Sequence, residues 1–129
     1  MIQKGSGEVV RYLPASSPGG EHPPLIVFLH SLEERGGPVE LLVDNPDGQG
    51  LGLAGYAGAQ EDFPFATLSP LCPRYGFWTF MHRRLAALVN EITAEYKLDQ
   101  KRVFLTGVSM GGMGAWSLGM YQPNLRCKS

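Results

Sequence analysis

The chain has 129 residues, enough for one domain that buries about two-thirds of its unfolded surface. Hydrophobic residues make up 43% of it and the net charge is −1, which describes an ordinary globular domain and excludes a broadly basic nucleic-acid-binding surface. No apolar run is long enough to span a bilayer, and Met1 to Gly5 lack the apolar core of a signal peptide, so we expect a cytoplasmic protein without a membrane partner.

Three short apolar segments of the first half are typical of strands. Residues 9–13 predict the first, which Pro14 closes. Residues 25–29 form a continuous apolar run of the kind that a parallel strand buried on both faces requires. Residues 65–69 predict a third strand, halted by Pro70. The intervening segments are rich in turn residues, and a short helix near 50–56 is weakened by its glycines.

The clearest helical pattern covers residues 80–96. Its apolar residues recur at spacings of 4, 3, 4 and 4, which places them in one stripe: Met81, Leu85, Leu88, Ile92 and Tyr96. Its charged residues fall largely elsewhere on the helix: Arg83, Arg84, Glu91 and Glu95. Residues 98–101 then form a turn that leads into an apolar strand at 103–105. Strands that alternate with helices predict one α/β domain over residues 1–129, with a mostly parallel sheet.

A nucleophile-elbow motif follows the strand at 103–105. Gly107, Ser109 and Gly111 match Gly-x-Ser-x-Gly, and the small residues at 113–121 can form the helix that the motif requires. With 17 glycines in the chain, a given serine has glycines at both positions roughly 2% of the time by chance. The strand before the motif and the helix after it favour a nucleophile elbow over a merely structural turn, whereas the reactivity of Ser109 is a separate question.

Several motifs of the chain together resemble α/β-hydrolases of the esterase, predicted-peptidase and polyhydroxybutyrate-depolymerase-like group. These motifs are Leu29-His30-x-x-x-Glu34-Arg35-Gly36, Ser69-Pro70-Leu71-Cys72-Pro73, Trp78, and Arg102-Val103-Phe104-Leu105-Thr106-Gly107-Val108-Ser109-Met110-Gly111-Gly112. The resemblance implies that Ser109 attacks an ester carbonyl without a cofactor or metal. It also implies that backbone N–H groups of Met110 and Leu32 hold the oxyanion.

The sequence departs from this family in two places. Ser31 and Glu33 stand where the family has glycines after the histidine, which puts the loop path and the donor Leu32 in question. No Asp, Glu or His follows Ser109, although the family has its triad acid and histidine there. The resemblance therefore implies a hydrolase domain cut short after the nucleophile helix.

The base that would activate Ser109 is left open by the sequence. His30 is the best placed because it follows a strand, where ligands of α/β sheets bind, and it acts either as the base or as a brace of the oxyanion loop. His22 and His82 are expected to be solvated. Asp62 and Glu34 are candidates for the acid only because they lie in loops.

The sequence thus predicts a carboxylesterase for short-chain esters that works through an acyl-Ser109 intermediate. The alternative is a catalytically dead hydrolase domain that acts only in binding or assembly. Cys72 and Cys127 lie far apart in the sequence and outside any metal-binding spacing, so we expect two free thiols.

Self-association is a further expectation. The strand at 103–105 should have one open edge, because no strand that would cover it is evident in the last residues. An open apolar edge without lysine, proline or bulge favours pairing with another copy of the chain.

Overall fold

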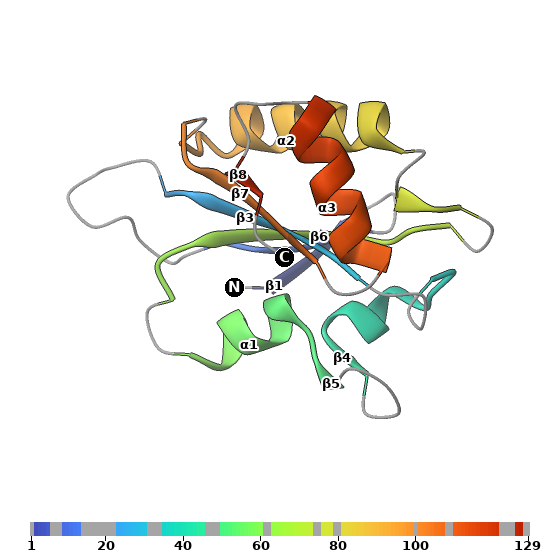
Figure 1. Cartoon of the computed structure of the whole chain (residues 1–129). Helices are drawn as coiled ribbons and strands as arrows, with labels where there is room; N and C mark the ends of the chain where they lie inside the picture. The colour runs from blue at the N-terminus through green and yellow to red at the C-terminus, as the bar shows by residue number, and fades with distance from the viewer. Residues whose placement is uncertain are drawn as a thin grey trace.

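The computed structural model of the chain describes residues 2–5, 9–13, 23–30, 35–45, 50–60, 63–73, 76–78, 81–99, 101–107, 110–121 and 126–127. Its centre is a six-stranded sheet in the order β1-β2-β6-β3-β7-β8 (Figure 1). The strands are β1 (Ile2–Gly5), β2 (Val9–Tyr12), β3 (Leu25–Leu29), β6 (Ala66–Pro70), β7 (Val103–Gly107) and β8 (Arg126–Cys127). β6, β3, β7 and β8 run parallel, whereas β2 is antiparallel to both β1 and β6.

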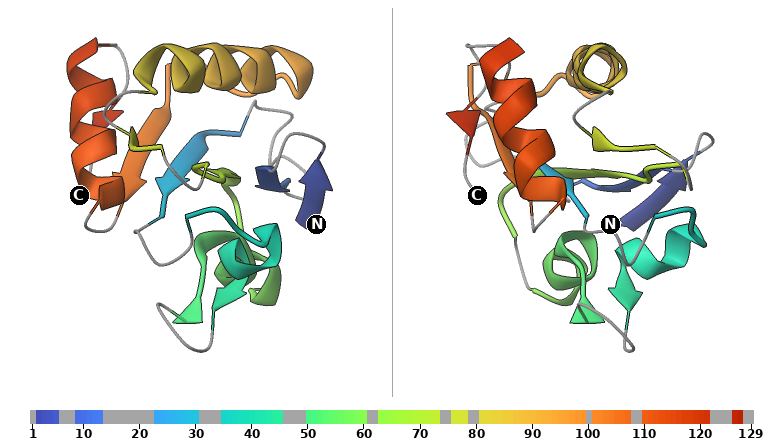
Figure 2. Two further views of the ribbon diagram at one scale, coloured as in Figure 1. Left: turned by 90° about the vertical axis from the view of Figure 1, so that its right-hand side faces the viewer. Right: turned by 45° about the vertical axis from the view of Figure 1, so that its right-hand side comes forward.

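Helices cover both faces of this sheet. The helices α2 (His82–Glu95) and α3 (Met110–Tyr121) lie on the upper face in Figure 1, and α1 (Leu53–Ala59) lies below it. The 3-10 helix η3 (Val39–Leu42) and the small hairpin of β4 (Asp44–Asn45) and β5 (Gly50–Leu51) join α1 on the lower side (Figure 2). The predicted α/β architecture is therefore confirmed.

The predicted elements exist with small shifts of their ends. β3 has the predicted bounds, and α2 falls within the predicted 80–96 helix. Leu85 and Ile92 of its apolar stripe are buried, and all four of its named charged residues are exposed. The strand β1 was not predicted, because residues 2–5 carry no apolar alternation and become a strand through backbone pairing with β2.

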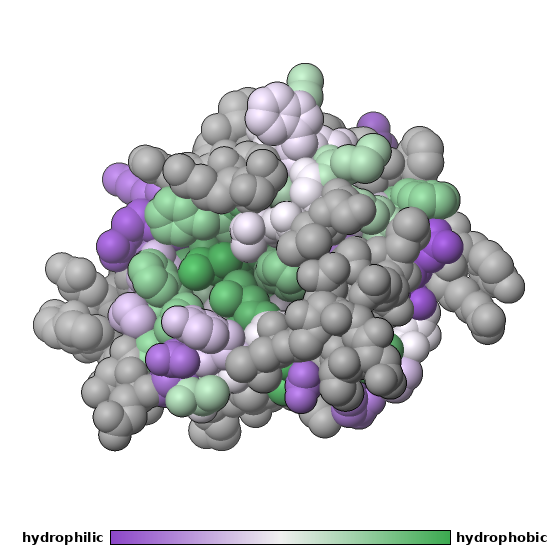
Figure 3. All heavy atoms as spheres, turned by 60° about the horizontal axis from the view of Figure 1, so that its bottom comes forward, coloured by the Kyte–Doolittle hydropathy of each residue, from purple (hydrophilic) through white to green (hydrophobic). Residues whose placement is uncertain are grey.

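Burial of the central strands differs from the prediction. All five residues of β6 are buried, but β3 and β7 each alternate between buried and half-buried positions. Ile26, Phe28, Phe104 and Thr106 occupy the half-buried positions, and in the register Ile26 pairs with Phe104. α1 packs under β6, β2 and β1 rather than under these two strands. The lower side, seen in Figure 3, accordingly has hydrophobic residues gathered in a hollow of its surface.

The expected open edge of β7 is corrected by the structure. β8 pairs with β7 in parallel, so that Phe104 is opposite Arg126 and Leu105 is opposite Cys127. A strand of two residues forms here without an apolar run of its own, because the ladder is made by backbone groups. The route to self-association through the edge at Val103 to Leu105 therefore loses its premise.

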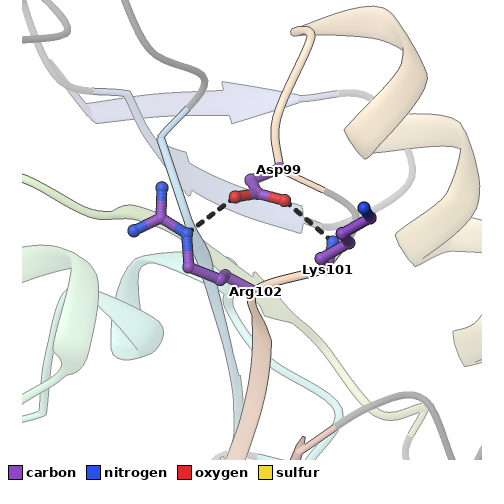
Figure 4. Close-up of polar contacts among 3 residues, drawn as sticks. All are labelled: Asp99, Lys101 and Arg102. Carbon is purple, nitrogen blue, oxygen red and sulfur yellow. Dashed lines mark hydrogen bonds and ion pairs between the residues drawn. The ribbon is translucent and has the colours of Figure 1, made fainter. Parts of the chain in front are cut away.

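The turn between α2 and β7 is built around Asp99. Its two carboxylate oxygens accept hydrogen bonds from the backbone N–H of Lys101, at 2.9 Å, and from Nε of Arg102, at 2.7 Å (Figure 4). The side-chain hydrogen bond from Arg102, followed by that from Lys101, lowers the pKa of Asp99. The Asp99 N–H also donates to the carbonyl of Pro23, just before β3, which ties the start of β3 to the approach to β7.

Candidate active site

The segments that follow β3 and β7 leave the sheet at neighbouring positions. The two strands are parallel, and Leu29, the last residue of β3, pairs with Gly107, the last residue of β7. β6 ends at the same edge, because it is parallel to β3 on the other side. Carboxyl ends of adjacent parallel strands are where ligands of α/β sheets bind.

Only two residues connect β7 to α3. β7 ends at Gly107 and α3 begins at Met110, so that only Val108 and Ser109 lie between strand and helix. Both residues are outside the described part of the chain. A helix leaves its first four N–H groups without partners inside the helix, and its N-terminal end carries partial positive charge. The strand before Ser109 and the helix after it, both of which the motif requires, are therefore present.

Glycines allow the first turn of α3 to touch the sheet. A Cβ on Gly111 would overlap the carbonyl oxygen of Leu29 and would lie 2.8 Å from the carbonyl oxygen of His30. A Cβ on Gly107 would overlap the backbone of Gly111. Because glycine has no Cβ, α3 can start directly against the carboxyl end of β3. The motif glycines thus have a packing role that sequence spacing alone does not reveal.

His30 is buried, with 2% of its surface exposed, and its ring is engaged. Nε2 accepts a hydrogen bond of 2.9 Å from the backbone N–H of Cys72. Since a neutral imidazole has one acceptor nitrogen, that lone pair is already used. Of the two roles that the sequence left open for His30, this geometry favours the brace over the base.

The loop after β3 is joined to the loop after β6 by further hydrogen bonds. The indole N–H of Trp78 donates to the carbonyl oxygen of His30 at 2.9 Å, and the N–H of Gly36 donates to the carbonyl of Cys72 at 2.9 Å. Nη1 of Arg35 donates to the carbonyl of Gly76 at 3.2 Å. Its guanidinium also lies over the ring of Phe77, 4.9 Å from the ring centre. These contacts therefore hold the two loops together at the carboxyl ends of the strands.

Cys72, in the loop after β6, is a buried free thiol. Burial raises the pKa of the Cys72 thiol, and the positive charge of Arg35 opposes this rise. Its Sγ lies 3.8 Å from Sδ of Met81. A thiol that stays protonated in an apolar setting is a weak nucleophile, so Cys72 is a packing residue whose backbone holds His30.

Of the other predicted site residues, the structure describes the side chain of Met110 alone. Met110 is the first residue of α3 and is buried. Leu32, Glu34, Asp62 and His22 lie outside the described residues, and His82 begins α2 with its side chain likewise undescribed. In the sequence, Cys72 and Trp78 are only members of motifs and have no assigned role. Their spacing from His30, 42 and 48 residues along the chain, offers no signal that the three meet.

A groove of about 750 Å³ runs along α2 and the loop after β6. Its lining includes the apolar residues Val9, Leu71, Trp78 and Leu88, together with charged residues of α2. None of its lining residues comes from β7 or α3. We therefore place the candidate site at the strand ends, on the chemistry of the turn, rather than in this groove.

The described residues contain neither a metal-binding cluster nor a membrane-spanning helix. No three His, Cys, Asp or Glu side chains gather there in a way that could hold a metal ion. Among the helices of the described ranges, none has the length and apolar character needed to cross a membrane.

Comparison with known proteins finds likeness in fold. No family model matches the chain, and no curated protein matches it in sequence. A thermostable esterase superposes with a TM-score of 0.75 at 24% identity, over 98% of this chain and 38% of its own. Acetyl xylan esterase from Aspergillus awamori gives 0.67 at 20% identity, over 98% and 48%. A mutant feruloyl esterase module from Clostridium thermocellum, complexed with sinapinate, gives 0.64 at 13% identity, over 96% and 49%.

The chain spans less than half the length of each of these three structures. Nearly all of it is nevertheless covered in each comparison. The parallel order β6-β3-β7 and the two-residue spacing between β7 and α3 agree with the resemblance that the sequence motifs carry. The chain therefore has the α/β-hydrolase fold, in the form shared with these esterases.

Proposed function

We propose that the protein is a serine carboxylic-ester hydrolase that acts on short-chain acyl esters. The observation that carries the proposal is the two-residue connection between β7 and α3, which holds Ser109 between a strand end and a helix N-terminus. The proteins of the same fold named above are esterases of different substrates, which supports ester chemistry without selecting a substrate.

The proposed reaction has two steps. The Ser109 oxygen attacks the ester carbonyl carbon, the bond from that carbon to the alkoxy oxygen breaks, and the serine proton ends on this oxygen, so that an alcohol leaves and an acyl-Ser109 ester remains. Water then attacks that ester and releases the acid and the free serine. Backbone N–H groups at the start of α3, with Met110 first, and in the loop after β3 would stabilise the negative oxygen of each tetrahedral intermediate.

His30 is not the proton acceptor for Ser109 in this proposal, because its Nε2 accepts a hydrogen bond from the backbone N–H of Cys72. An oxyanion hole and binding alone retain roughly 10³–10⁴-fold rate over water in serine hydrolases. Esters with good leaving groups need little help from a general acid, so activated acetate and butyrate esters are the substrates of choice.

The hydrogen-bonded ring of His30 also favours a second candidate function. A hydrolase fold whose buried histidine serves as a brace is also consistent with a catalytically dead domain that acts in binding or assembly. The two functions differ in whether Ser109 reacts covalently.

Labelling with an organophosphonate ester separates the two functions. We expect one adduct per chain by intact mass, located on the tryptic peptide 103–126, and no adduct in Ser109→Ala. Ser117→Ala is the matched control, because Ser117 lies on α3 within the same peptide. Hydrolysis of p-nitrophenyl butyrate should depend on Ser109 in the same way as the labelling does. An unlabelled parent, or a Ser109→Ala variant that labels and hydrolyses equally well, would reject the esterase and favour the binding domain.

A further inference from the structure

Trp78 is the largest fully buried side chain of the described residues, and it touches both halves of the candidate site. It lies in the loop after β6, three residues before α2 begins its first turn at Met81, whose N–H donates to the carbonyl of Trp78. A residue that only fills a core has no need of a polar atom. Trp78 uses its indole N–H in one specific hydrogen bond.

That hydrogen bond holds the point where the chain leaves β3. The indole N–H donates to the carbonyl oxygen of His30 at 2.9 Å, and the two rings meet edge to face with their centres 5.0 Å apart. The other side of the His30 ring accepts from Cys72. The start of the loop after β3 is thus fixed through both its backbone and its side chain.

The opposite side of Trp78 supports α3. A Cβ on Gly114 would overlap the Cβ of Trp78 and would lie 2.9 Å from its Cγ and 3.1 Å from Cδ1 of Leu29. α3 therefore packs on Trp78 with only a glycine between them. The position of α3 along this contact determines where its first turn lies relative to the end of β3.

We propose that Trp78 is a positioning residue that sets the spacing between the loop after β3 and the first turn of α3. This inference rests on the proposed function, since those two segments would supply the N–H groups that hold the oxyanion. Such donors act only when they lie within about 0.5 Å of the productive geometry. One rigid, buried indole that contacts both segments is a direct means of holding that geometry.

The test compares Trp78→Phe with a benzothienylalanine replacement at the same position. The second variant keeps the shape of the indole and puts sulfur in place of its N–H, so it remains informative if Trp78→Phe folds poorly. Leu98→Ala is the control, because Leu98 is a buried core residue near the amino ends of the parallel strands, opposite the candidate site.

We expect both Trp78 variants to lower kcat for p-nitrophenyl butyrate about tenfold with little change in KM. That is less than the 10²–10³-fold loss that removal of an oxyanion donor itself causes. Leu98→Ala should keep the parental kcat per folded molecule even where it unfolds at lower urea. A kcat within twofold of the parent in the benzothienylalanine variant would overturn the inference.

Hydrogen exchange measured by mass spectrometry decides the same question without turnover. In the Trp78 variants, exchange should accelerate about tenfold in peptides that span residues 30–36 and 110–114, and stay parental in β2. Exchange that is unchanged, or faster everywhere, would overturn the positioning role. If the parent shows no Ser109-dependent hydrolysis, the proposed function fails, and the exchange pattern still settles how Trp78 acts on the two segments.

Discussion

The imidazole of His30 is held at a strand end by contacts that favour a bracing role over proton transfer. It is buried, it accepts from Cys72, and its own carbonyl accepts from Trp78. Each of these partners belongs to the loop after β6. The histidine therefore transmits the position of that loop to the end of β3, next to the turn that carries Ser109.

Replacement of His30 by alanine should destabilise the fold and slow turnover. The N–H of Cys72 would lose its acceptor in a buried place, which costs about 1–3 kcal/mol of unfolding free energy. Urea unfolding measures this loss, and kcat per folded molecule, corrected by circular dichroism, should also fall. His30→Gln offers an acceptor on a flexible side chain and should recover part of the stability. A folded His30→Ala variant with full activity and stability would remove His30 from the site.

Cys72 makes the fold sensitive to alkaline pH. Because burial raises the pKa of the folded thiol, the unfolded chain loses its thiol proton at lower pH than the folded chain does. The Cys72 thiol thus contributes fully to the free energy of unfolding below the ordinary thiol pKa of about 8.5, and this contribution falls as pH rises through and above that value. Urea midpoints from pH 7 to 10 should decline more steeply for the parent than for Cys72→Ala. Parallel declines in the two proteins would contradict this reading.

Among the elements, α3 is set against β3 by glycines at chosen positions of its first turns. Gly111 and Gly114 face the sheet and Trp78, where any Cβ would overlap other atoms. Gly112, on another side of the helix, has only ordinary neighbours, the nearest being the carbonyl oxygen of Gly107 at 3.4 Å. The contact between the helix and the end of β3 is thus backbone against backbone.

Gly111→Ala and Gly112→Ala should change stability in opposite directions. The first forces α3 away from Leu29 and should cost about 1–3 kcal/mol or more, as overpacking does. The second removes backbone freedom of the unfolded chain at a helical position with room for a methyl group, and should stabilise by about 0.4–1 kcal/mol. Urea unfolding of the two single variants tests the pair. Equal effects of the two substitutions would contradict the assigned packing.

Considered as a whole, the molecule exposes apolar surface on both sides of the sheet. On α3, the exposed residues Met113, Trp116 and Met120 recur at spacings of three and four, and the helix has no charged residue. On the lower side, the half-buried residues of β3 and β7 lie beside α1 rather than beneath it, and Figure 3 shows hydrophobic residues there. Contiguous apolar surface of this kind typically marks an interaction site.

We expect the folded chain to associate with itself, now through these faces rather than through the edge of β7. Light scattering at several concentrations should give a mass above the 14.1 kDa of one chain. Trp116→Gln should lower the association, because Trp116 is 65% exposed in the single chain. Arg83→Gln, an exposed change on α2, is the control. A single 14.1 kDa species for the parent at micromolar concentration would contradict the expectation.

The sequence by itself determined the main strands and helices and their order, because its signals are local. The apolar run at 25–29, the stripe on α2 and the glycines around Ser109 each lie within one segment, and each segment folds as predicted wherever the structure describes it. The α/β architecture follows from their alternation. The sequence also shows Ser31 and Glu33 where the family that it resembles has glycines, since this needs only a comparison of motifs.

Tertiary structure alone decided how these elements meet. The hydrogen bonds from Cys72 and Trp78 to His30 join residues more than forty positions apart, and no periodicity encodes such pairs. β1 and β8 are strands only because a neighbouring strand offers backbone partners, and the half-burial of β3 depends on where α1 packs. Local patterns thus determine what each segment becomes, whereas the role of a polar atom such as Nε2 of His30 depends on which distant group reaches it.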